Sequence, residues 1–120
     1  MLTFYGYKQC GTCRKAEKAL EQAKVKYDFI DVTENPPPAQ ALKKMVQQAG
    51  VNYRKLFNTS GVQYREQKIK DKLPGMSEAD VMKLLAGNGR LIKRPIVTDG
   101  KRTTIGFSEA EFKKTWKRAV

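Results

Sequence analysis

The sequence contains no histidine and only two cysteines among its 120 residues. Without an imidazole base, a cysteine–histidine hydrolase is excluded. Two thiols also fall short of the four ligands of a structural zinc site, so we expect no metal unless carboxylates or a second subunit complete one. Cys10 and Cys13 lie together near the amino terminus. They therefore cannot cross-link distant segments, as the cysteines of a secreted disulfide scaffold do.

Long apolar runs are also missing. No stretch approaches the roughly 18 apolar residues of a membrane span, and the early charges Lys8, Arg14 and Glu17 rule out the apolar core of a signal peptide. We therefore expect a cytoplasmic protein with no membrane partner. In a reducing cytosol, a close cysteine pair is more often catalytic, redox-sensing or metal-binding than structural.

Acidic residues are scarce: 12 Asp and Glu face 24 Lys and Arg, for a net charge of +12. This excess favours acidic partners. The basic residues are scattered along the chain, however, and no nucleic-acid motif accompanies them. We therefore prefer a solvated basic surface to a nucleic-acid interface, and we expect a single-domain monomer.

The first third of the chain predicts a strand, a helix and a second strand. Residues 2–5 and 25–32 are rich in β-branched and aromatic side chains. Between them, over residues 12–24, apolar residues recur at the spacing of an amphipathic helix. Such a unit pairs its two strands in parallel, with the helix covering one face of the sheet.

The middle of the chain predicts helices. The prolines of residues 35–38 mark a boundary, and an apolar stripe over residues 39–49 predicts a helix that ends at Gly50. Residues 51–75 show no clear period. A capping box at Ser77-Glu78-Ala79-Asp80 predicts the start of another helix, which ends at Gly87 and Gly89.

The last part predicts a hairpin and a helix. Residues 95–98 and 102–105 flank Asp99-Gly100, a pair typical of tight turns. Ser108 and Glu111 suggest a second capping box, before a helical stripe of Phe112, Trp116 and Ala119. The whole order predicts an α/β, thioredoxin-like (glutaredoxin-like) mixed sheet, βαβ then ββα. Its core is residues 1–33 and 93–120, with a helical insertion at about 34–92.

The candidate working centre is Cys10-Gly11-Thr12-Cys13 at the start of the first helix. A thiolate is the reactive form of cysteine, and a helix start, with Arg14 and Lys15 nearby, favours negative charge. We expect Cys10 to attack a disulfide, sulfenic acid or oxyanion and Cys13 to resolve the product.

Other residues near this motif leave alternatives open. Gly11 allows close backbone approach, and Thr12 is placed to donate a hydrogen bond to the Cys10 sulfur. The competing interpretation is a pair of buried, inert thiols. Arg94-Pro95 is either an ordinary proline at the start of a strand or a cis proline facing the thiols, with Arg94 steering an anion. Residues 58–61 predict a turn and Gly106 a bend, both structural.

Several motifs together resemble the ArsC/Spx family, which includes glutathione- or glutaredoxin-linked arsenate reductases and Spx transcriptional regulators. The matching residues are Tyr5, Lys8, residues 10–16, residues 56–59 and Arg94-Pro95-Ile96. The resemblance implies a thioredoxin-like fold, a reactive Cys10 and a cis Pro95 beside the site. Arsenate reductases of this type carry two further arginines where this chain has Asn58 and Gly106. Arsenate is therefore a poor expected substrate, while the second thiol, Cys13, matches Spx and favours an active-site disulfide.

Two functions follow. The first is a thiol–disulfide reductase that binds no cofactor and takes electrons from glutathione, glutaredoxin or thioredoxin, with Lys8, Arg14 and Arg94 favouring an anionic substrate. The second is an Spx-like redox switch, in which the Cys10–Cys13 disulfide alters docking on the RNA polymerase α subunit. We favour the reductase.

Overall fold

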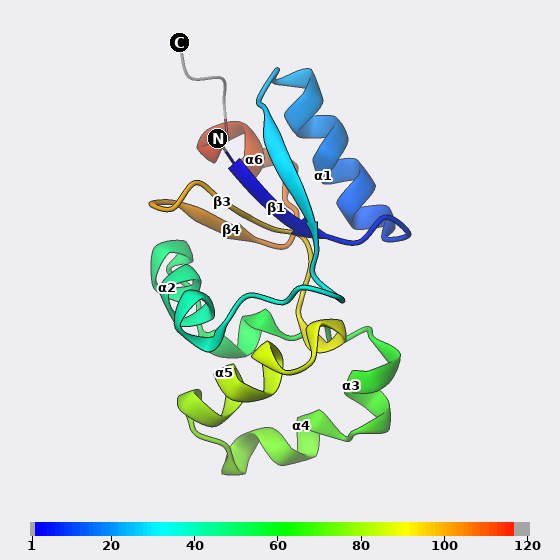
Figure 1. The fold of residues 1–120 in the computed structure, drawn as a ribbon, viewed down its shortest axis with the longest axis vertical. Coiled ribbons are helices and arrows are strands. Elements are labelled where there is room, and N and C mark those ends of the chain that lie inside the picture. The colour runs from blue at the N-terminus through cyan, green and yellow to red at the C-terminus, as the bar shows by residue number, and fades with distance from the viewer. Residues whose placement is uncertain (1, 117–120) are drawn as a thin grey trace.

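A four-stranded mixed sheet forms the centre of the computed structural model, which describes residues 2–116 (Figure 1). Its strands are β1 (Leu2–Gly6), β2 (Tyr27–Asp31), β3 (Ile96–Thr98) and β4 (Thr103–Ile105), in the order β2-β1-β3-β4. Strands β1 and β2 are parallel, while β1–β3 and β3–β4 are antiparallel. The predicted thioredoxin-like topology is confirmed.

Helices α1 (Gly11–Gln22) and α6 (Glu109–Thr115) cover one face of this sheet. Alternate residues of β1 are buried, as expected for a strand with two different faces. Leu2 and Phe4 pack with Leu20 of α1 and Phe112 of α6 in one apolar cluster. This cluster also contains Cys13, so the second thiol lies within the core.

The chain between β2 and β3 is helical. It contains α2 (Ala39–Ala49), α3 (Val62–Glu66), α4 (Ile69–Lys72) and α5 (Glu78–Ala86), with short 3-10 turns at Tyr53–Leu56, Leu73–Gly75 and Gly89–Leu91. Helix α2 packs near β4 and joins α5 in the apolar cluster on the second face of the sheet. The insertion boundaries at about 34–92 stay a prediction.

Helix ends largely agree with the sequence signals. Gly50 ends α2 in the left-handed conformation, and Ser77 and Asp80 form both halves of the predicted capping box. At α6 the box is only half formed, because Ser108 accepts from the Glu111 amide at 3.4 Å but no return bond accompanies it within the described residues. Ala119 lies outside the described residues.

Gly89 joins the helical part to the sheet. A Cβ atom at this position would collide with the backbone of Val32 and Thr33, just after β2. Only glycine permits this approach. Among residues 2–116, no helix is long and apolar enough to cross a membrane.

Candidate active site

Cys10 occupies the N-cap position of α1, and its sulfur faces the first turn. Its backbone is extended, with φ −89° and ψ 117°, and Sγ accepts a hydrogen bond from the Cys13 amide at 3.3 Å. No acidic residue lies in that turn. An amide donor and the positive end of a 12-residue helix therefore stabilise negative charge on this sulfur.

Cys13 lies one turn further along and is fully buried. Burial raises the pKa of the Cys13 thiol to about 12, and a hydrogen bond to Cys10 adds to the rise. Negative charge on Cys10 raises this pKa further, whereas the charge of Arg94 opposes the rise. Both cysteines are free thiols. Cys13 is therefore protonated at neutral pH, and it is buried, whereas Cys10 is partly exposed.

The Arg94–Pro95 peptide bond is cis, as the family resemblance implies. Pro95 is buried, and its carbonyl accepts a hydrogen bond from the Gly106 amide at 2.8 Å. The Arg94 guanidinium lies over the Tyr7 ring, 5.0 Å from its centroid, a contact that orients the cation.

A pocket of about 660 Å³ opens beside Cys10. Four segments form it: the loop after β1, the start of α1, the segment before β3 and the residues after β4. Residues 57–62 supply the remaining wall. Of the predicted site residues, Cys10, Thr12 and Arg94 line this pocket together.

The wall at residues 57–62 is held by backbone hydrogen bonds. The Asn58 amide donates to the Leu91 carbonyl at 2.8 Å, and the Lys93 amide donates to the Leu56 carbonyl at 2.6 Å. Phe57 and Ile92 pair as an isolated β-bridge between them. The helical part of the chain thus contributes one side of the pocket.

Lys8 and Arg14 lie outside the pocket lining. The Lys8 ammonium is 4.2 Å from the centroid of the Phe29 ring and pairs with Glu17 at 3.7 Å. Arg14 Nε donates to the Lys8 carbonyl at 3.1 Å. These contacts connect the loop before α1 with α1 and β2, and neither cation lines the pocket. Their role toward an anionic substrate stays a prediction.

The two spacer residues differ from each other in role. A Cβ at Gly11 would meet no atom within 4 Å, so the approach to the helix start is open. Thr12 lines the pocket, but among the described residues the hydrogen bond to Cys10 Sγ comes from the Cys13 amide. Backbone rather than hydroxyl therefore contacts the sulfur.

Several pocket residues carried no functional signal in the sequence. Tyr7, Gln9, Lys93 and Phe107 line the pocket. Residues 58–61 and Gly106 line it too; their local pattern indicated a turn and a bend, and only the family resemblance marked Asn58 and Gly106 as arginine positions of arsenate reductases. The topology does supply a signal. Because β1 and β3 are antiparallel, the end of β1 lies beside the start of β3. Tyr7, after β1, and Lys93, before β3, therefore lie at the same end of the sheet.

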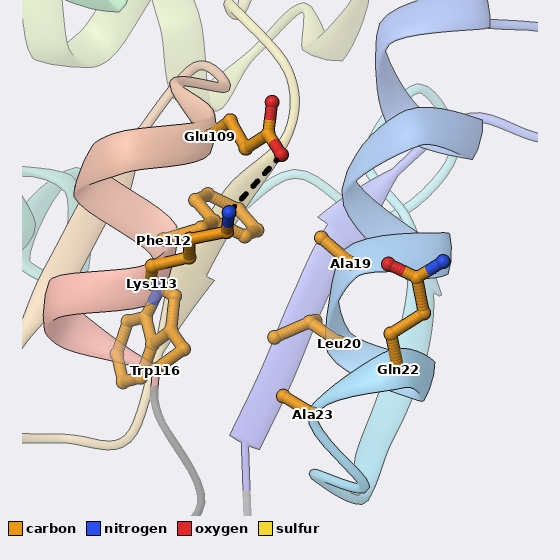
Figure 2. A pocket seen from close by; sticks show the side chains of 8 residues that line it. All are labelled: Ala19, Leu20, Gln22, Ala23, Glu109, Phe112, Lys113 and Trp116. Carbon is orange, nitrogen blue, oxygen red and sulfur yellow. Dashed lines mark ion pairs between the residues drawn. The ribbon is translucent and has the colours of Figure 1, made fainter.

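A second cavity, of about 300 Å³, lies between α1 and α6 (Figure 2). Its lining is mostly apolar, with the Glu109–Lys113 ion pair (3.4 Å) at its rim. Neither cysteine lines this cavity. Within residues 2–116 no group of three or more Cys, Asp or Glu side chains could hold a metal ion.

Several known proteins are similar to this chain along most of its length. The uncharacterized protein YusI of Bacillus subtilis is 48% identical over 115 residues, covering 96% of this chain and 98% of YusI. The crystal structure of a possible arsenate reductase from Streptococcus mutans is 42% identical, with a TM-score of 0.83 over 89% of this chain and 91% of that one. The global transcriptional regulator Spx of Enterococcus faecalis is 28% identical, covering all of this chain and 89% of Spx. The ArsC family model matches residues 5–115, and the chain belongs to the ArsC family.

Proposed function

We propose that this protein is a cytoplasmic thiol–disulfide reductase in which Cys10 is the nucleophile and Cys13 the resolving thiol. One observation carries the proposal. The Cys10 sulfur lies at a helix N-terminus on a pocket that also contains Arg94, while a second thiol lies buried one turn away. Exposed attack and shielded resolution are the two tasks of a dithiol reductase.

The reaction begins with attack by the Cys10 thiolate on one sulfur of a substrate disulfide. The disulfide bond breaks, one half leaves as a thiolate, and Cys10 becomes a mixed disulfide. Loss of the negative charge on Cys10 removes one of the influences that raise the Cys13 pKa. Cys13 then gives up its proton and attacks the Cys10 sulfur, which releases the second half as a thiolate.

The Cys10–Cys13 disulfide left by this step holds two electrons fewer than the starting dithiol. Two external thiols restore it, and we assign them to glutathione, glutaredoxin or thioredoxin. No bound cofactor is required. A monomer suffices for the whole cycle, because both cysteines belong to one chain.

Disulfides suit the pocket better than arsenate. Arg94 lines it, but Asn58 and Gly106 are uncharged where the family resemblance implies arginines. Arsenate would lose charge-assisted hydrogen bonds at both positions. The similarity to a possible arsenate reductase supports reductase chemistry in general, rather than that substrate.

Turnover tests the proposal. The full chain is incubated with a protein disulfide, a low-molecular-weight disulfide or arsenate, with glutathione plus glutaredoxin or with thioredoxin as donor. We expect reduction of at least one disulfide above the rate of the Cys10→Ser variant, and little or no arsenate reduction. Equal rates for the native chain and Cys10→Ser with every substrate would contradict the reductase.

The second candidate is a redox switch. Its support is the match to Spx along the whole chain together with the paired cysteines. In this function the Cys10–Cys13 disulfide would alter docking on the RNA polymerase α subunit without turnover. A pull-down with that subunit distinguishes the two: binding in only one redox state favours the switch, and no binding in either state eliminates it.

A further inference from the structure

The side chain of Lys93 lies across Gly106. Gly106 is buried, and a Cβ atom there would lie 2.9 Å from Lys93 Cε and 3.6 Å from Nζ. Contacts below about 3 Å force a shift, so any other residue at position 106 would push the lysine aside. Gly106 also has φ +82°, which glycine adopts without strain. The missing side chain of Gly106 therefore leaves the space that the Lys93 side chain occupies.

Backbone hydrogen bonds fix both partners. The Lys93 amide is bound to the Leu56 carbonyl, and the Gly106 amide is bound to the Pro95 carbonyl. The lysine stem thus starts from an anchored position and rests on an anchored surface. This arrangement brings the exposed Lys93 side chain to the pocket at Gly106.

The pocket lining places this ammonium beside a second cation. Lys93 and Arg94 both line the pocket that contains Cys10, and no Asp or Glu lines it. Neither cation takes part in an ion pair among the residues that the structure describes. By contrast, Lys8 is paired with Glu17. The segment before β3 therefore brings two positive charges to the pocket, and no acidic side chain among the described residues pairs with either.

We infer that Lys93, whose side chain packs against Gly106, is a specificity-determining residue. It pairs with a carboxylate of a small anionic disulfide while Cys10 attacks that disulfide. This role rests on the proposed reductase function. The pocket volume of about 660 Å³ exceeds what a single oxyanion needs and falls within the range of small-ligand sites. Lys93 binds the substrate half that carries the charge and does not contact the reacting sulfurs.

Two disulfide probes of different charge test this role on the full chain. Dithiobis-nitrobenzoate carries carboxylates, whereas dithiodipyridine is uncharged, and each releases a coloured thiol when Cys10 attacks. Each first-turnover rate is divided by the rate of the same probe with a free thiol in solution, which removes the intrinsic reactivity of the probe. The readout is the ratio of the anionic to the uncharged value.

We expect Lys93→Gln to lower this ratio by about threefold to tenfold, as loss of one nearby charge implies. Lys93→Arg should restore most of it. Lys44→Gln, at an exposed position of α2, is the matched control and should leave the ratio unchanged. Gly106→Ala should lower the ratio by displacing the lysine. Thermal melting confirms that each variant is folded.

Each possible negative result contradicts a different claim. An equal change for both probes in Lys93→Gln, or an equal loss in Lys44→Gln, overturns the role of Lys93 alone. If folded Gly106→Ala keeps the native ratio, Gly106 does not position the Lys93 side chain. A native chain that reacts with neither probe overturns the proposed reductase and this inference with it.

Discussion

The two parts of the molecule contribute different things to the same pocket. The first part is the sheet with α1 and α6. Cys10 and Cys13 lie at the start of α1, and Arg94 lies just before β3. The helical part, from α2 to the turn at Gly89–Leu91, contributes only uncharged residues from the segment 57–62 to the pocket. The cysteines and cations of the proposed site therefore belong to the sheet part, while the helical part supplies one wall of the pocket.

One apolar cluster lies on each face of the sheet. Leu2, Phe4 and Phe112 belong to the cluster under α1 and α6, whereas Leu42 and Leu85 of the helical part share the second cluster with Ile96 of β3. The comparison teaches that the proposed reactive thiols and the wall formed by residues 57–62 come from different parts of the chain. Substitutions at the cysteines should alter the rate of disulfide reduction, and substitutions in the helical part should alter the free energy of unfolding or the shape of the pocket.

The largest expected effect comes from removing the nucleophile. Cys10→Ser should lower disulfide reduction by about a thousandfold or more, because a hydroxyl ionises far less readily than a thiol. The melting temperature should change little, since Cys10 is only partly buried. Steady-state turnover and thermal melting measure both. If Cys10→Ser keeps an activity within tenfold of the native chain, Cys10 is not the nucleophile.

Next in size is the joint between the two parts. Gly89→Ala should lower the free energy of unfolding by about 2 to 3 kcal/mol, because the new Cβ collides with the backbone after β2. Denaturant unfolding followed by circular dichroism measures this loss. Gly75→Ala is the matched control, since no atom lies within 4 Å of its Cβ position; equal losses in the two variants would contradict the argument.

Removal of the resolving thiol should have a smaller effect on rate and a distinctive product. Cys13→Ala leaves the Cys10 attack intact, so a mixed disulfide on Cys10 should accumulate and turnover of a protein disulfide should fall by about tenfold. Mass spectrometry of the intact chain detects the adduct. If the native chain accumulates the same amount, Cys13 does not resolve it.

The smallest effect compares the two helix caps. Ser77→Ala removes the bond that the Ser77 hydroxyl accepts from the Asp80 amide at 3.1 Å, keeps the return bond from the Ser77 backbone amide, and should cost about 1 kcal/mol of unfolding free energy. Ser108→Ala removes only the long 3.4 Å bond of α6 and should cost less. Paired denaturation curves measure the difference. A larger loss in Ser108→Ala would reverse the predicted ranking.

The sequence predicted the regular elements more completely than the pocket. Strand composition, helical period and the Ser77 cap are local signals, and each was confirmed. The pocket depends on contacts between distant segments, such as the Lys93 amide with the Leu56 carbonyl. No local period encodes these contacts. The local pattern therefore indicated only a bend at Gly106, and it did not reveal that the missing side chain leaves room for Lys93.

Trp116 gives the two-part architecture an optical consequence. It is the single tryptophan of the chain, it is 2% exposed, and its Nε1 donates to Thr104 Oγ1 at 2.9 Å. Its cluster is the one under α1 and α6. Tryptophan emission therefore reports melting of that side of the sheet alone, whereas far-ultraviolet dichroism also registers α2 and α5. Coincidence or separation of these two signals shows whether the halves unfold together.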